Sequence, residues 1–175
     1  SVSFALERLG VEFHITDNPE EIQQADKVIF PGVGEASTTM NYLRERKLDQ
    51  VMRDLKQPLL GVCLGMQLMC KYSEENNTEC LGIFDESVKM FVPTGDKKVP
   101  HMGWNNLTLT NGWLDRATEN QYAYFVHSYY VPVNPHSSAI TEYINPFSAA
   151  MHKDNFYAVQ FHPEKSAVTG ELVIQ

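Results

Sequence analysis

The sequence has no block of basic residues and no long apolar segment. Its 175 residues include 14 lysines and arginines against 22 aspartates and glutamates, which gives a formal net charge of −8 at pH 7. Because a nucleic-acid-binding surface concentrates positive charge, this balance argues against nucleic acid as a partner, and the single pair Lys97–Lys98 does not change it. No apolar stretch approaches the length of a membrane span or a signal peptide, so we expect no membrane partner.

Cysteine is scarce as well, and the common metal-binding patterns are missing. The 3 cysteines, Cys63, Cys70 and Cys80, are an odd number without paired spacing. This count indicates reduced thiols and a cytoplasmic protein. Neither C-x-x-C nor H-E-x-x-H occurs, and the histidines other than His162 are scattered along the chain. We therefore expect no metal and no cofactor.

What the chain does contain is a cysteine between two glycines, directly after an apolar run. Residues 58–62 read as a buried strand and residues 64–72 as the helix that follows it. Gly61 and Gly65 allow a sharp turn at this junction, which is typical of a nucleophile elbow. The first amides of the helix, beginning with Leu64 N–H, lack intrahelical partners and can stabilise a thiolate and later an oxyanion. The pattern predicts that Cys63 is a nucleophile.

A second apolar run, residues 156–161, ends at His162-Pro163-Glu164. Pro163 ends the strand and keeps His162 extended. Because residues two apart in an extended chain project to the same side, Glu164 can reach the ring nitrogen of His162 that faces away from the thiol. The carboxyl ends of parallel strands meet at one edge of a sheet, so the two motifs can form a Cys-His-Glu triad. Singly they are more often a packing cysteine and a strand exit, but together they favour a hydrolytic site.

The remaining pattern predicts an α/β fold. In the first half we expect helices over residues 2–10 and 36–55 and strands over residues 11–15 and 26–30, joined by right-handed crossovers into a parallel sheet. From residue 80 onward the pattern changes to short strands, which we expect as hairpins against that sheet, over residues 88–92, 107–110, 122–126 and 138–143. Neither a repeat nor a linker interrupts the chain, so we expect a single domain over residues 1–175.

A loop with two glycines, Pro31-Gly32-Val33-Gly34, follows the strand at residues 26–30. By itself such a loop is most simply a turn. Beside a cysteine elbow, however, an oxyanion hole needs one further amide from a neighbouring loop. This loop is therefore a candidate second wall of the site.

The elbow segment Gly61-Val62-Cys63-Leu64-Gly65-Met66-Gln67, together with Gln160-Phe161-His162-Pro163-Glu164, resembles the class I glutamine amidotransferases. Within that class, Met66 and the segments 31–34, 100–105, 125–130 and Lys165-Ser166 resemble the glutaminase subunits of imidazole glycerol phosphate synthases. The resemblance covers essentially the whole chain. It implies a three-layer, flavodoxin-like α/β fold with a mainly parallel central sheet and added hairpins.

The resemblance also implies a role for each matching residue. Cys63 attacks the carboxamide of glutamine, His162 transfers the protons, and Glu164 orients His162. The oxyanion is expected to bind the amides of Leu64 and Val33. The amino-acid end of glutamine is expected to contact Gly34, Gln67, Ser128, Tyr129 and, as a weaker candidate, Glu75.

By the same resemblance, ammonia passes to a cyclase partner with a (β/α)8 barrel fold, in a heterodimer. That cyclase makes imidazole glycerol phosphate for histidine synthesis and releases an aminoimidazole carboxamide ribotide. The family places Tyr124, Trp104 and Lys165 near the cyclase interface. Without the family, these residues read as hairpin aromatics and a solvated cation.

The chain departs from the family at both ends. The family begins with a strand before the helix that opens this chain and ends with a helix beyond residue 175, so we expect a domain truncated at both ends. Two alternatives remain open at this point. Another class I amidotransferase, serving anthranilate or aminodeoxychorismate synthesis, is disfavoured by Met66 and residues 100–105. A non-catalytic binding module is disfavoured by the joint presence of Cys63, His162 and Glu164.

Overall fold

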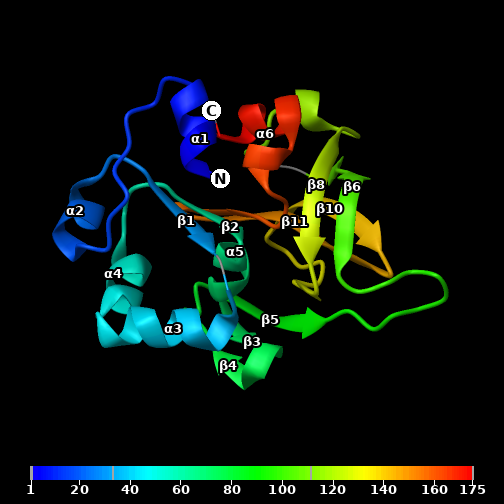
Figure 1. The fold of residues 1–175 in the computed structure, drawn as a ribbon, viewed down its shortest axis with the longest axis horizontal. Coiled ribbons are helices and arrows are strands. Elements are labelled where there is room, and N and C mark those ends of the chain that lie inside the picture. The colour runs from blue at the N-terminus through cyan, green and yellow to red at the C-terminus, as the bar shows by residue number, and fades with distance from the viewer. Residues whose placement is uncertain (1, 33, 111, 175) are drawn as a thin grey trace.

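A six-stranded sheet forms the centre of the computed structural model, which describes residues 2–32, 34–110 and 112–174 (Figure 1). Three neighbouring strands are parallel, and the other three join them in antiparallel fashion. In their order across the sheet, the strands are β1 (Val28–Gly32), β2 (Leu59–Cys63), β12 (Phe156–Val159), β11 (Asn145–Lys153), β10 (Ser137–Tyr143) and β7 (Thr108–Leu109). The parallel part contains β2, the strand that ends at Cys63.

Two smaller sheets lie beside the central one. The first contains β4 (Thr78–Glu79), β3 (Cys70–Ser73), β5 (Phe84–Met90) and β9 (Tyr129–Tyr130), and the second is the hairpin of β6 (His101–Asn106) and β8 (Tyr122–His127). The α-helices are α1 (Val2–Arg8), α2 (Pro19–Gln24), α3 (Ala36–Glu45), α4 (Leu48–Asp54), α5 (Leu64–Leu68) and α6 (Ala167–Ile174). Short 3-10 helices cover Glu75–Asn77, Arg116–Thr118 and Pro163–Lys165.

The central sheet separates two hydrophobic cores. Figure 1 shows α3 and α4 on one side of the sheet and α1 and α6 on the other. Successive residues of β12 point to opposite faces, so Ala158 belongs to the core with α3 to α5 and Val159 to the core that includes the β6–β8 hairpin. This is the three-layer α/β arrangement that the sequence predicts.

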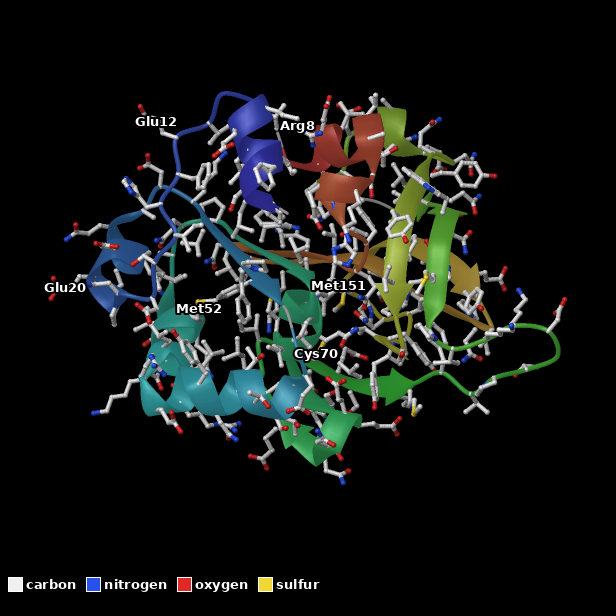
Figure 2. The ribbon with its side chains drawn as sticks, viewed as in Figure 1. Arg8, Glu12, Glu20, Met52, Cys70 and Met151 are labelled. Carbon is white, nitrogen blue, oxygen red and sulfur yellow. The ribbon has the colours of Figure 1, made fainter. Side chains whose placement is uncertain are left out.

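The side-chain view agrees with this division between interior and surface. Figure 2 shows Met52, Cys70 and Met151 inside the molecule, and all three are buried. Glu12 and Glu20 extend from its periphery and are exposed. Burial raises the pKa of the Cys70 thiol, and burial also raises that of Cys80, to about 11. These two cysteines are packing residues.

The predicted strand at residues 11–15 is wrong. Val11 is 47% and Ile15 is 84% exposed, and β1 lies at the edge of the sheet with β2 as its neighbour. Extended residues form a strand only when a neighbouring backbone accepts and donates hydrogen bonds. In the part of the chain that the structure describes, residues 11–15 have no such neighbour.

Two predicted helices are shorter than expected. The helix over residues 36–55 is divided into α3 and α4 because Lys47 adopts a left-handed conformation with φ of 57°. The helix over residues 64–72 ends after Leu68, because Cys70–Ser73 pair with β4 and β5 instead. The sequence pattern did not reveal β6, β11 or α6.

Two glycines let the first turn of α5 lie against β1. A Cβ atom on Gly65 would lie 2.0 Å from the carbonyl oxygen of Phe30, and one on Gly32 would lie 2.3 Å from the Cβ of Leu64. Neither distance is compatible with any larger residue unless the backbone moves. Glycine at these positions therefore fixes how closely α5 approaches β1.

We expect a Gly65→Ala substitution to destabilise the fold by about 3 kcal/mol or more, because the added methyl group overlaps a backbone carbonyl that cannot rotate away. The measurement is urea-induced unfolding followed by circular dichroism. Gly82→Ala is the matched control, since its Cβ would meet no atom within 4 Å and only its φ of +75° is unfavourable. We expect about 1 kcal/mol there. Equal losses in both variants would contradict the close-approach argument.

Candidate active site

Cys63 lies where β2 ends and α5 begins. Its backbone has φ of 55° and ψ of −112°, a conformation that residues with a side chain rarely adopt. This sharp turn projects the thiol out of the sheet, where it is partly exposed. Leu64, the first residue of α5, follows directly and is buried. The geometry is that of a nucleophile elbow.

The sulfur of Cys63 lies near three polar groups from other parts of the chain. The carbonyl oxygen of Val126 is 3.8 Å from it, and the side-chain nitrogen of Gln160 donates to it at 3.7 Å. The His162 ring lies close enough to the sulfur that Cys63 raises its pKa. These contacts bring β2, β8 and the segment after β12 together at one point.

His162 and Glu164 form a close pair. His162 Nδ1 donates to Glu164 Oε1 at 2.7 Å, and the carboxylate is only 5% exposed. The extended conformation expected before Pro163 is present, since His162 has φ of −95° and ψ of 101°. The other ring nitrogen of His162 is thereby free to face Cys63.

The charges of this pair reinforce each other. The Cys63 sulfur and the Glu164 carboxylate, as acceptors beside the ring, raise the pKa of His162 to about 9, against an opposing effect of burial. Burial by itself would raise the pKa of Glu164, but the hydrogen bond with His162 and the neighbouring charge lower it below its ordinary value. Both effects favour the imidazolium–carboxylate form of the pair.

The backbone of His162 is fixed by its neighbours. Its N–H donates to the carbonyl of Tyr124 at 2.9 Å, and the hydroxyl of Ser166 donates to its carbonyl at 2.6 Å. The same hydroxyl accepts the N–H of Tyr124 at 3.0 Å. Ser166 is 1% exposed, so these bonds are shielded from water. His162 thus cannot move without moving β8.

Gln67 lies on α5, four residues after Cys63, and is buried. Its side-chain nitrogen donates to the carbonyl of Tyr129 at 3.0 Å and to Gln160 Oε1 at 2.9 Å. Both amide hydrogens are thus used inside the protein, although the sequence analysis expects Gln67 to contact substrate. Ser128 is also partly engaged, because its carbonyl accepts the N–H of Phe91 at 3.0 Å.

The expected second wall of the site is only partly described. Val33 lies outside the described residues. Gly34 is exposed and has φ of +91°, which favours glycine. Glu75 Oε1 accepts the N–H of Ala36 at 2.8 Å, so this carboxylate caps the start of α3 directly after the loop.

The three residues that the family places at an interface lie together on the surface. Trp104 and Tyr124 are opposite each other in the β6–β8 hairpin, with ring centroids 5.8 Å apart. The Lys165 amine lies 6.0 Å from the centre of the Tyr124 ring. Trp104 is 53% exposed. We call this group the hairpin patch.

The structure also brings together two histidines that the sequence analysis left as scattered. His101 and His127 are opposite each other in the hairpin, and His101 Nδ1 lies 3.0 Å from His127 Nε2. Burial lowers the pKa of His101 to about 4 and that of His127 to about 3. The alternation of residues along the two strands is the signal that could have paired them, but it requires the register of the hairpin.

A metal site and a membrane span are the two remaining features to consider. Over residues 2–32, 34–110 and 112–174, no group of three or more histidine, cysteine, aspartate or glutamate side chains is arranged to hold a metal ion. The helices of this described part of the chain all lack the length and apolar character that a bilayer span requires.

Comparisons with known proteins agree on one family. The model of the family "glutamine amidotransferase class-I" matches residues 1–174. A Bacteroides thetaiotaomicron protein called imidazole glycerol phosphate synthase subunit HisH is 60% identical, over 100% of this chain and 90% of its own length. A Vibrio parahaemolyticus protein with the same name is 45% identical, over 100% of this chain and 89% of its own length.

Solved structures support the fold. One glutamine amidotransferase crystal structure superposes with a TM-score of 0.74 at 18% identity, covering 99% of this chain and 88% of the other. A glutamine amidotransferase from Thermotoga maritima superposes with a TM-score of 0.61 at 15% identity, covering 96% of this chain and 71% of the other. The predicted fold class is thus confirmed.

We expect a Cys63→Ala substitution to lower the pKa of His162 from about 9 towards its ordinary 6.5, because the Cys63 hydrogen bond contributes most to the raised value. The measurement is an NMR titration of the ring. A raised pKa in the folded state means that protonated His162 stabilises the fold fully below pH 6.5, and that this contribution is lost as the pH rises through about 9. Cys80→Ala is the control, and an unchanged midpoint in Cys63→Ala would contradict the assignment.

Proposed function

The chain belongs to the class I glutamine amidotransferases and, within them, to the HisH subunits of imidazole glycerol phosphate synthase, and we propose that Cys63, His162 and Glu164 are its catalytic triad. One observation carries this proposal. Cys63 and the hydrogen-bonded His162–Glu164 pair lie together at the carboxyl ends of two adjacent parallel strands, β2 and β12. The activity is hydrolysis of glutamine to glutamate and ammonia, and it serves histidine biosynthesis.

We assign each member of the triad a step. His162 accepts the thiol proton of Cys63, and the sulfur attacks the carboxamide carbon of glutamine to form a tetrahedral intermediate. His162, whose raised pKa favours the protonated ring, then donates that proton to the leaving nitrogen, the C–N bond breaks and ammonia departs. Water then attacks the resulting thioester, with His162 accepting its proton, and glutamate leaves. Glu164 holds the ring orientation throughout.

The negative oxygen of the tetrahedral intermediate needs donors beside Cys63. We assign the amide of Leu64, at the start of α5, and the amide of Val33, in the loop after β1, to this oxyanion hole. For the amino-acid end of glutamine we assign Gly34 and the backbone of Ser128 and Tyr129. Gln67 and Glu75 complete the set, Gln67 with its side-chain carbonyl oxygen because its amide hydrogens are already used.

Ammonia requires a protected route because most of it is ammonium at neutral pH, and ammonium is not a nucleophile. We propose that a cyclase subunit with a (β/α)8 barrel docks on the hairpin patch as a heterodimer and receives ammonia directly. Exposed Trp104 supplies the aromatic anchor typical of interface hot spots. A cytoplasmic location is consistent with a thiol nucleophile, since reducing conditions preserve it.

The names of the curated relatives favour this assignment over the alternatives. A subunit that serves anthranilate or aminodeoxychorismate synthesis would carry the same triad, so the triad alone does not separate them. A non-catalytic module would have no use for an assembled Cys63–His162–Glu164 site. The HisH relatives match the full length of this chain.

We expect Cys63→Ala to lower glutaminase activity in the cyclase complex by about 10⁴-fold or more, since removing the nucleophile of a triad removes nearly all of its rate enhancement. The measurement is glutamate release from glutamine. Cys80→Ala, which removes a buried thiol outside the site, should retain activity. Binding of Cys63→Ala to the cyclase should equal that of the wild type. Retained activity in Cys63→Ala would exclude the proposed nucleophile.

We expect Trp104→Ala to weaken binding of the cyclase by about 10-fold or more, because a large exposed aromatic of the hairpin patch loses its contact area. Calorimetric titration of the cyclase measures this. Lys27→Ala, an exposed change directly before β1, is the control. Unchanged affinity in Trp104→Ala would place the partner elsewhere.

A further inference from the structure

The His101–His127 pair is a rigid feature of the interior. His101 is 3% and His127 is 6% exposed. The His101 ring stacks on Tyr143 with centroids 4.1 Å apart and on Phe125 with centroids 5.0 Å apart. His127 packs against Phe91 and Phe147 at 5.2 and 5.0 Å. Aromatic neighbours on several sides leave the two rings no other orientation.

Their hydrogen bonds allow one arrangement of protons. His127 Nδ1 lies 2.8 Å from the carbonyl oxygen of Tyr129, which can only accept, so Nδ1 carries the proton. His127 Nε2 is then an acceptor, and the Nδ1–H group of His101 donates a hydrogen bond to it at 3.0 Å. His101 Nε2 is left as an acceptor and faces the side-chain nitrogen of Asn105 at 3.5 Å. Both rings are neutral and both are fixed in the Nδ1-protonated tautomer.

The Tyr129 carbonyl connects this pair to the elbow. It accepts a second hydrogen bond, from the side-chain nitrogen of Gln67 at 3.0 Å. The same nitrogen donates to Gln160 Oε1, and Gln160 Nε2 then faces the Cys63 sulfur at 3.7 Å. Gln67 is 5% and Gln160 is 0% exposed, so water does not replace any of these partners. Each amide is oriented by the group before it.

We propose that His127 is a positioning residue for the glutaminase reaction, which holds the Tyr129 carbonyl and through it the Gln67 and Gln160 amides, so that a hydrogen-bond donor faces the Cys63 sulfur. This inference rests on the proposed function. If the side-chain amide of Gln160 were flipped, its oxygen would face the sulfur. That oxygen would repel the negative charge that develops when the thiol loses its proton. The carbonyl of Tyr129, anchored from one side by His127, prevents that reversal.

The test compares two substitutions of His127 in the complex with the cyclase. His127→Phe keeps the aromatic packing but removes the Nδ1 donor, and we expect kcat for glutamine hydrolysis to fall about 10- to 100-fold with little change in KM. His127→Asn places a side-chain N–H close to the position of Nδ1, and we expect it to recover most of that loss. His152→Phe, on the far end of β11, is the matched control and should retain wild-type kcat.

The outcomes separate this inference from the proposed function. An inactive wild-type complex would contradict the proposed function itself. A wild-type kcat in His127→Phe, or an equal loss in the Phe and Asn variants, would overturn the role of the donor while leaving the function intact. Thermal unfolding and cyclase binding of each variant show whether it is folded.

A measurement on the unsubstituted protein keeps the inference testable if His127→Phe does not fold. Nitrogen-15 NMR distinguishes protonated from unprotonated ring nitrogens, and we expect His127 in the wild type to be Nδ1-protonated and neutral. An Nε2-protonated ring would break the hydrogen bond to Tyr129 and overturn the proposal.

Discussion

The close approach of α5 to β1 is the constraint on which the rest of the site depends. Because Gly65 has no side chain, the first turn of α5 lies directly against the Phe30 carbonyl, and Gly32 lets β1 continue past Leu64. The chain between β2 and α5 must then turn within one residue. Cys63 is that residue, and its unfavourable backbone conformation is the cost of the turn. Packing on both sides holds it there, so the reactive side chain is presented by the most strongly determined part of the fold.

The base is held in a different way. His162 follows a strand rather than a tight turn, and hydrogen bonds rather than packing fix it. Glu164 sets the ring, while Tyr124 and Ser166 hold the backbone. Burial opposes the charge on His162, and the Cys63 sulfur and the Glu164 carboxylate outweigh it and raise the pKa of the ring. Packing therefore positions the nucleophile, whereas hydrogen bonds and neighbouring charges position the base.

Sequence reasoning succeeded where the determining interactions are local. The elbow at Cys63 and the His162–Glu164 contact follow from glycine and proline within a few residues, and both are present. It failed where the pairing of strands far apart in the sequence determines the structure. Residues 11–15 have a strand-like sequence but no neighbouring strand, and Cys70–Ser73 continue a helical pattern but pair with β5. Lys47, which lies between α3 and α4, has a left-handed backbone although it is not a glycine, so the sequence gives no sign of this break. The His101–His127 contact depends on hairpin register, which no short motif encodes.

Tyr124 belongs to the surface and to the interior at the same time. Its ring stands beside Trp104 and Lys165 on the outside, while its peptide groups bond to His162 and Ser166 inside. Tyr124 thus connects the hairpin patch to the backbone of His162. A partner that displaced the Tyr124 ring would therefore act, through one residue, on the backbone that carries the proton-transferring imidazole.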